Sequence, residues 1–228
     1  DFGSSVITGT GAFTLNSGAK IVTANADGIS LSGATGSIQV SGTRTFGEGA
    51  DYHYNGSVAQ VTGSVVSSPG GIIVSNSVGL TFSDNIVMDY LTINTGSKVN
   101  LGNSLEHSAG LLILGSNGYT SGSFGGTGSG ADNINTTFFL ASTGFVQLEP
   151  ISKVYSTSTT IVIPCDVTEI TAEVWGGGGR GGTRTTSGSG GGGGGGAYSK
   201  GVVSVTPGDT YTITVGEGSS GTSPGGDS

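Results

Sequence analysis

The sequence predicts an all-β protein, a parallel β-helix or solenoid followed by a smaller glycine-rich β domain, and three observations indicate it. Gly supplies 47 of the 228 residues, about three times its ordinary share of roughly 7%. Residues that favour helices do not recur at helical spacing, so no amphipathic helix of ordinary length is expected. Apolar runs recur before residue 176, which argues against a disordered chain.

The first strands are short and end at residues that tolerate a positive φ. They alternate inward and outward positions, as half-buried strands do. Such short strands suit a solenoid, in which each coil turns a corner after one strand and stacks on the coil before it. The expected strands include Ala12–Leu15, Lys20–Thr23, Ser37–Val40 and Tyr52–Tyr54.

The densest apolar pattern lies in Asn85–Leu105, where Gly and Asn occupy the expected corners. These corners fit the tight bends of a parallel β-helix. Runs before and after this segment would fill successive layers of one continuous core. These runs are Ile72–Val74, Leu80, Phe82 and Leu111–Leu114.

The end of this region needs a cover, because an open end of a β-helix is an exposed edge. We expect residues Gly115–Asn135 to form a long loop with Tyr119 and Phe124 packed beneath it. Two closing strands, Thr136–Leu140 and Gly144–Leu148, are expected to follow.

A domain boundary is predicted near Glu149–Pro150, which divides the chain into a β-helical repeat region, 1–150, and a glycine-rich β domain, 151–228, truncated at its C-terminal end. We expect Asp1–Ser228 to be the ordered part of a longer polypeptide. Turn residues separate the strands of the second domain. Its expected elements are strands at Ile161–Ile163 and Ile170–Trp175 around a Pro164–Asp166 turn, the glycine run Gly176–Gly196, and strands at Ala197–Val205 and Thr210–Val215 around a Pro207–Asp209 turn.

Charge and cysteine content exclude several functions. The net charge is -8 and the seven basic residues are scattered, so non-specific nucleic-acid binding is not expected. The single Cys165 excludes an intrachain disulfide framework. No apolar run reaches the roughly 18 residues of a membrane span, so the fragment is not expected to span a membrane.

The glycine run has the clearest physical content of the candidate sites. Chains without Cβ atoms can approach closely and pack as polyglycine II helices, and strands bracket this run on both sides. A flexible linker is the alternative. The residues predicted to form the glycine lattice are Gly176, Gly177, Gly178, Gly179, Gly191, Gly192, Gly193 and Gly194.

Three aromatic residues are candidates for stacking on a glycan. Trp175 directly precedes the glycine run, and its alternative role is that of a core or capping residue. Tyr52 and Tyr54 share one face of a strand, with His53 on the other. On an exposed face this pair would bind glycan, and on an inward face it is core.

No metal, cofactor or catalytic residue is expected. His53 and His107 have no partners at ligand spacing, and the acidic residues occur singly, without the calcium-binding repeat of β-solenoids. No G-x-S-x-G elbow occurs, and Cys165 has no nearby His. Carbohydrate-active enzymes also use β-helices, but they need converging carboxylates, and the sparse charges here predict none.

The first part of the chain resembles the degenerate β-helical repeats of very large bacterial cell-surface proteins. The segments that carry this resemblance are ITGTGAFTLNSGAKIVTANADGI, TGSIQVSGTRTFGEGADYHYNG, LILGSNGYTSGSFGG and NTTFFLASTGFVQL, within about the first 150 residues. Such proteins are typical of gliding and biofilm-forming bacteria that use type IX secretion.

Residues 161–228 resemble the glycine-rich domain of bacterial surface proteins and phage tail adhesins. There an apolar strand ending in Trp-Gly leads into a glycine-rich segment, and a V-x-P-G-x-x-Y-x-I-x-V-G strand pair follows, here VTPGDTYTITVG. The mixed Arg180–Ser189 stretch departs from that pattern and leaves open whether the whole run packs.

Together the resemblances imply a non-enzymatic adhesin or filament segment at the outside of a bacterial cell, of the gliding-motility type. Its partners would be surface glycans, neighbouring cells, or the secretion or motility machinery of the envelope. A phage tail-tip receptor-binding adhesin and a β-helix carbohydrate-active enzyme, using a carboxylate such as Asp89 or Glu106, are the alternatives.

Overall fold

A computed structural model describes residues 1–64, 68–150, 152–163, 167–182, 187–188, 190–206 and 209–216. The predicted Pro164–Asp166 turn, with Cys165, and Pro207–Gly208 of the second turn lie outside these residues. All regular elements of the described chain are strands, so the all-β prediction is confirmed. The chain forms two compact units, Asp1–Ile151 and Ser152–Ser228.

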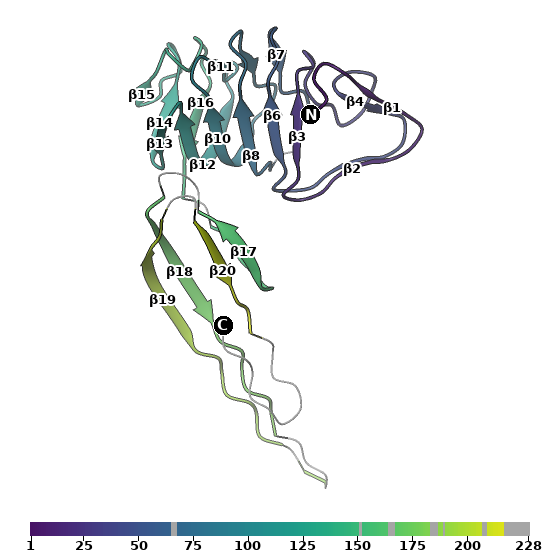
Figure 1. The fold of residues 1–228 in the computed structure, drawn as a ribbon. Coiled ribbons are helices and arrows are strands. Elements are labelled where there is room, and N and C mark those ends of the chain that lie inside the picture. The colour runs from purple at the N-terminus through teal and green to yellow at the C-terminus, as the bar shows by residue number, and fades with distance from the viewer. Residues whose placement is uncertain are drawn as a thin grey trace. The chain divides into compact units, whose positions relative to one another are not determined.

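The described residues of the first unit form sixteen strands, and Figure 1 labels most of them. They are β1 Ile7–Gly9, β2 Phe13–Leu15, β3 Lys20–Thr23, β4 Ile38–Val40, β5 Arg44–Phe46, β6 Asp51–Tyr54, β7 Gln60–Val61, β8 Gly71–Val74, β9 Leu80–Thr81, β10 Val87–Ile93, β11 Val99–Asn100, β12 Glu106–Leu114, β13 Asn117–Tyr119, β14 Gly122–Gly125, β15 Asn133–Ile134 and β16 Phe145–Leu148.

Two parallel ladders organise the middle of this unit. β3, β6, β8, β10 and β12 lie side by side in one sheet, and β7, β9 and β11 in another, so the chain alternates between the two sheets from β6 to β12. Near the N-terminus, β1 pairs with β4 and β2 with β5, also in parallel. Tyr52, Ile72, Leu91 and Leu112 are in register, about 20 residues apart, the spacing of a short structural repeat.

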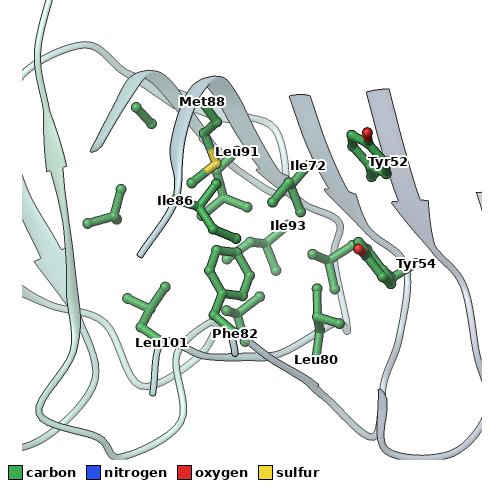
Figure 2. Packing of buried hydrophobic residues seen from close by; sticks show 14 of the residues in the cluster. Tyr52, Tyr54, Ile72, Leu80, Phe82, Ile86, Met88, Leu91, Ile93 and Leu101 are labelled. Atoms are coloured by element: carbon green, nitrogen blue, oxygen red, sulfur yellow. The ribbon is translucent and has the colours of Figure 1, made fainter. Parts of the chain in front are cut away.

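In-register residues form the core of the first unit. The side chains of Tyr52, Ile72, Leu91 and Leu112 are fully buried or nearly so, and Figure 2 shows Tyr52, Ile72 and Leu91 as neighbours in the apolar cluster. Leu80 and Phe82 enter this cluster from the second sheet and its continuation. Within the predicted apolar runs, alternate residues lie in this one core, namely Ile72, Val74, Leu80, Phe82, Leu112 and Leu114, whereas Ile73, Leu111 and Ile113 do not belong to it.

A buried amide network replaces apolar packing at one corner. The Gln60 side-chain carbonyl accepts hydrogen bonds from the Gly56 N–H at 2.7 Å and from Asn76 Nδ2 at 2.8 Å. Its Nε2 donates to the carbonyls of Thr23 at 3.2 Å and Asn25 at 2.9 Å. Because Gln60 and Asn76 are both buried, these bonds satisfy polar atoms that water cannot reach.

Two predictions about the end of the first unit are wrong. Residues Gly115–Asn135 are not a plain loop, because they contain β13, β14 and β15. Thr136–Leu140 is not a strand, since only Phe139 makes a bridge, to Val99. The segment lies beside β11 at this one parallel bridge, where the Val99 N–H donates to the Phe138 carbonyl and the Leu140 N–H to the Val99 carbonyl, each at 2.8 Å. The Tyr119 and Phe124 rings pack together with centroids 4.8 Å apart.

The described residues of the second unit form two antiparallel pairs of strands. β17 (Thr159–Val162) pairs with β20 (Thr210–Ile213), and β18 (Glu169–Trp175) pairs with β19 (Tyr198–Ser204). The β18–β19 ribbon is half-buried at best along its whole length. A two-stranded ribbon without cover is marginally stable in water. The exposure of the side chains of this ribbon therefore requires an explanation.

No helix in the described part of the chain is both long and apolar enough to cross a membrane.

Candidate functional site

The β18–β19 register gathers the candidate site on one face of the ribbon. Trp175 at the end of β18 lies opposite Tyr198 at the start of β19, and Glu173 lies opposite Lys200. Opposed residues of an antiparallel pair point to the same face, and alternate residues share it. The four side chains therefore belong to one surface, here called the aromatic face.

The two rings of the aromatic face are open to solvent. The Trp175 and Tyr198 ring centroids are 5.5 Å apart, with the planes tilted by 40°. The side chains are 62% and 53% exposed, respectively. A core or capping Trp would bury its ring, so the structure assigns Trp175 neither role and presents it as an accessible platform.

An ion pair borders this platform. Lys200 Nζ donates a hydrogen bond to Glu173 Oε1 at 2.7 Å. That bond, together with a hydrogen bond from the Tyr198 hydroxyl, lowers the pKa of Glu173. The pKa of Lys200 is raised by the same carboxylate, and the pKa of Tyr198 is raised by desolvation and then by its bond to Glu173. Glu173 is thus held as a carboxylate beside the rings.

This arrangement can recognise a polar, ring-shaped ligand. The faces of Trp and Tyr rings attract C–H groups and flat apolar surfaces, while their edges reach polar atoms. The carboxylate of Glu173 accepts and the ammonium of Lys200 donates hydrogen bonds. Sugars offer an apolar face and a rim of hydroxyls, and so fit both parts of the surface.

Tyr52 and Tyr54 do not belong to this surface. Both side chains are fully buried, and Figure 2 places them side by side in the apolar core. The Tyr54 hydroxyl donates to the Thr62 carbonyl at 2.9 Å, and burial raises the pKa of both hydroxyls. The exposed-face prediction for this pair is therefore wrong, because alternation along β6 turns both rings inward.

The two histidines are separate and each has its own partner. His53 Nε2 lies 2.8 Å from Ser75 Oγ. His107 accepts a hydrogen bond from the Ile86 N–H at Nδ1, 3.2 Å, and its Nε2 lies 2.9 Å from the Leu101 carbonyl. Burial lowers the pKa of both rings. Within the described residues, no group of three or more His, Cys, Asp or Glu side chains is arranged to hold a metal ion.

The two glycine runs continue the ribbon as paired arms, Gly176–Gly182 and Gly190–Ala197. Hydrogen bonds join Gly176 N to the Ala197 carbonyl at 2.7 Å, Gly179 N to Gly194 at 2.9 Å and Gly182 N to Gly191 at 2.8 Å. The bonds therefore recur at every third residue, whereas a β-ladder has a period of two. The structure brings the two groups of predicted lattice glycines together in this way.

Glycine is required in these arms at the same period of three. A Cβ atom on Gly190, Gly193 or Gly196 would lie 1.7 to 2.0 Å from a carbonyl oxygen of the opposite arm. A Cβ atom on Gly191, Gly192, Gly194 or Gly195 would meet no atom within 4 Å. The first set is needed for the approach of the arms within one chain, and the second set faces outward.

Sequence reasoning missed Glu173, Tyr198 and Lys200 as site residues. A hairpin symmetric about the run Gly176–Gly196 would place Ala197 opposite Trp175, one residue before the observed partner Tyr198. The run therefore signals an aromatic residue near Trp175 but does not fix the register. The ion pair has no equivalent signal, because it depends on which alternate residues share the aromatic face.

Comparison with known families gives one result. Residues 153–228 match a family described as a glycine-rich domain. The match covers the second unit, with the aromatic face and the glycine arms, and leaves the parallel ladders of the first unit without a family. No curated protein and no solved structure matches the chain.

Proposed function

We propose that this chain is a non-enzymatic adhesin or surface-filament segment of a larger secreted bacterial protein, which attaches the cell to glycans or to neighbouring cells. The proposal rests on the exposed Trp175–Tyr198 pair bordered by the Glu173–Lys200 ion pair. Large exposed aromatic residues are costly on a surface that has no partner. A sugar stacked on these rings would explain their exposure.

The first unit would serve as the stalk, as a parallel β-helix. In-register positions about 20 residues apart and the alternation between two parallel ladders support this architecture. A stack of hydrogen-bonded coils is stiff and would carry a binding module away from the cell. Its residence at the outside of the cell and export by the type IX route, for gliding or biofilm attachment, form part of the same proposal.

The glycine arms would pack as polyglycine II strands. Their three-residue period of hydrogen bonds and close contacts supports this, because polyglycine II has three residues per turn. None of the described glycines of the arms has a positive φ, as the extended left-handed helix requires. A flexible linker would have no fixed pairing.

Attachment of coated beads tests the proposal. Beads carrying the 228-residue chain should bind bacterial or host cells and purified surface polysaccharides. Trp175→Ala should reduce binding about tenfold or more, as expected for loss of a stacking contact worth roughly 1–3 kcal/mol. Val202→Ala is the matched control, because Val202 is 66% exposed on the same face but has no ring.

Two outcomes would contradict the proposal. Beads that attach to none of these targets would argue against adhesion. Turnover of a polysaccharide that is lost on changing Asp89 or Glu106 would make the chain an enzyme instead. The phage tail-tip alternative is favoured only by the glycine-rich match, and it predicts binding to a bacterial receptor rather than between cells of one strain.

A further inference from the structure

We propose that the second unit associates with a second copy of this chain, through the face of the β18–β19 ribbon opposite the aromatic face and through the outer sides of the glycine arms. The two surfaces together are called the neutral face. The ribbon part of the neutral face consists of Ile170, Ala172 and Val174 of β18 and Ser199, Gly201 and Val203 of β19.

The neutral face is apolar and accessible. Val174 and Val203 are 44% and 43% exposed, and Ile170 and Ala172 are only half-buried. Such a strip on a two-stranded ribbon has no second layer within the ribbon itself to cover it. Sheets become stable when one face is covered, so a partner that covers this strip would stabilise the ribbon.

Charge distribution selects a second copy as the occupant. The chain has a net charge of -8, so two copies repel each other over most of their surfaces. The charged residues of the ribbon, Glu169, Glu173 and Lys200, all lie on the aromatic face. The ribbon parts of two neutral faces therefore meet without like charges, and each offers the other the same mixture of Val, Ile and small residues, as a self-complementary interface requires.

The glycine arms extend this surface with backbone groups. A Cβ on Gly191, Gly192, Gly194 or Gly195 would meet no atom within 4 Å, and a sequence period of three recurs in the N–H groups that bond the described arms, those of Gly176, Gly179 and Gly182. The outward amides are a ready template for pairing with another extended chain. The arms of a second copy supply such a chain with the same three-residue period.

The dimensions agree with an interface that needs both parts. Seven residues of strand are about 24 Å long and two strands about 10 Å wide, which gives the ribbon face roughly 240 Å². Arms of similar length at about 3.1 Å per residue add roughly 220 Å². The sum of about 460 Å² per partner lies in the range of small, transient interfaces, which bury less than about 600 Å² per partner, and the ribbon alone would give about half of that sum.

Sedimentation velocity of the 228-residue chain over a range of concentrations tests the proposal. The unchanged chain should form dimers or larger oligomers. Val203→Lys, which places a charge on the neutral face, should raise the dissociation constant about tenfold or more. Val202→Lys is the matched control, because it adds the same charge to the next residue, on the aromatic face, and it should associate as the unchanged chain does.

Both valines are exposed, so neither lysine should unfold the ribbon, and Trp175 fluorescence can verify this. If the unchanged chain stays monomeric at all concentrations, the proposal is overturned, whatever Val203→Lys does to the ribbon. Another part of the same chain would then cover the neutral face. Equal association of the two lysine variants would also overturn it.

A glycine pair tests the part played by the arms. Gly194→Ala adds a methyl group where the chain itself leaves space, so it should keep the arms paired and still weaken association about tenfold. Gly193→Ala places its methyl 1.7 Å from the Gly179 carbonyl oxygen and should disturb the arms within one chain. If Gly194→Ala associates as the unchanged chain does, the arms are not part of the interface.

Discussion

Tyr52→Phe and Tyr54→Phe should change the stability of the first unit in opposite directions. Both side chains are fully buried on the same face of β6. The Tyr54 hydroxyl donates to the Thr62 carbonyl at 2.9 Å. The Tyr52 hydroxyl has no hydrogen-bond partner among the described protein groups. The two variants remove the same atom from two different environments.

The expected magnitudes follow from the cost of a buried hydroxyl. A typical hydrogen bond contributes about 1 kcal/mol net, and an unpaired buried polar group costs about 1–3 kcal/mol. Tyr54→Phe should therefore lower the free energy of unfolding by about 1 kcal/mol. Tyr52→Phe should raise it by about 1 kcal/mol, after allowance for the small gap left behind. In a unit of this size each change moves Tm by about 2–4 °C.

Thermal and urea unfolding monitored by far-UV circular dichroism would measure the difference. Hydrogen exchange of the amides in β6 and β8 would locate the effect in the first unit, since the single Trp175 reports on the second. Equal destabilisation by both variants would refute the reasoning, because the Tyr52 hydroxyl would then have to make a stabilising contact. Tyr52→Leu is a useful third variant, because it should destabilise through lost volume whatever the hydroxyl does.

Three further predictions concern the first unit. Burial lowers the folded-state pKa of His107 and of His53. Urea midpoints should therefore fall as the pH drops below about 6.5, because the unfolded chain takes up protons that the folded chain does not. Gly63→Ala should cost more than about 2 kcal/mol in chemical denaturation, because φ is +76° and a Cβ would lie 2.2 Å from the Ile29 carbonyl oxygen. Gly96→Ala, with φ +83° and open space, should cost only the roughly 1–2 kcal/mol of backbone strain. Gln60→Leu should cost about 1–3 kcal/mol by the same assay, since it removes four hydrogen bonds and leaves the buried Gly56 N–H without its partner.

Sequence patterns were sufficient to predict the fold class and many strands. Lys20–Thr23 was predicted and is observed as β3 with the same bounds. Composition predicts the fold class because helix-forming residues are scarce. Alternating apolar residues then predict where the strands lie. The Gly115–Asn135 segment was misjudged because Gly and Ser normally indicate loops, whereas β14 is held by tertiary pairing with β16 that no local pattern reveals.

The candidate site was predictable only in part. Trp175 was found from its place before the glycine run, but Tyr52 and Tyr54 were equally good candidates, because alternation fixes that two residues share a face and not which face is buried. Strand pairing with β3 and β8 decides it. The three-residue period of the arms could not be read from sequence either, since a run of identical residues has no phase of its own.

The parallel ladders of the first unit also determine how it would respond to force. A pull that separates neighbouring strands of a ladder acts along their hydrogen bonds, so these bonds break in sequence rather than all at once. Each coil of about 20 residues would then release roughly 70 Å of extended chain. Under tension the unit would lengthen in steps of similar size and low force, a behaviour that spreads a sudden load over time.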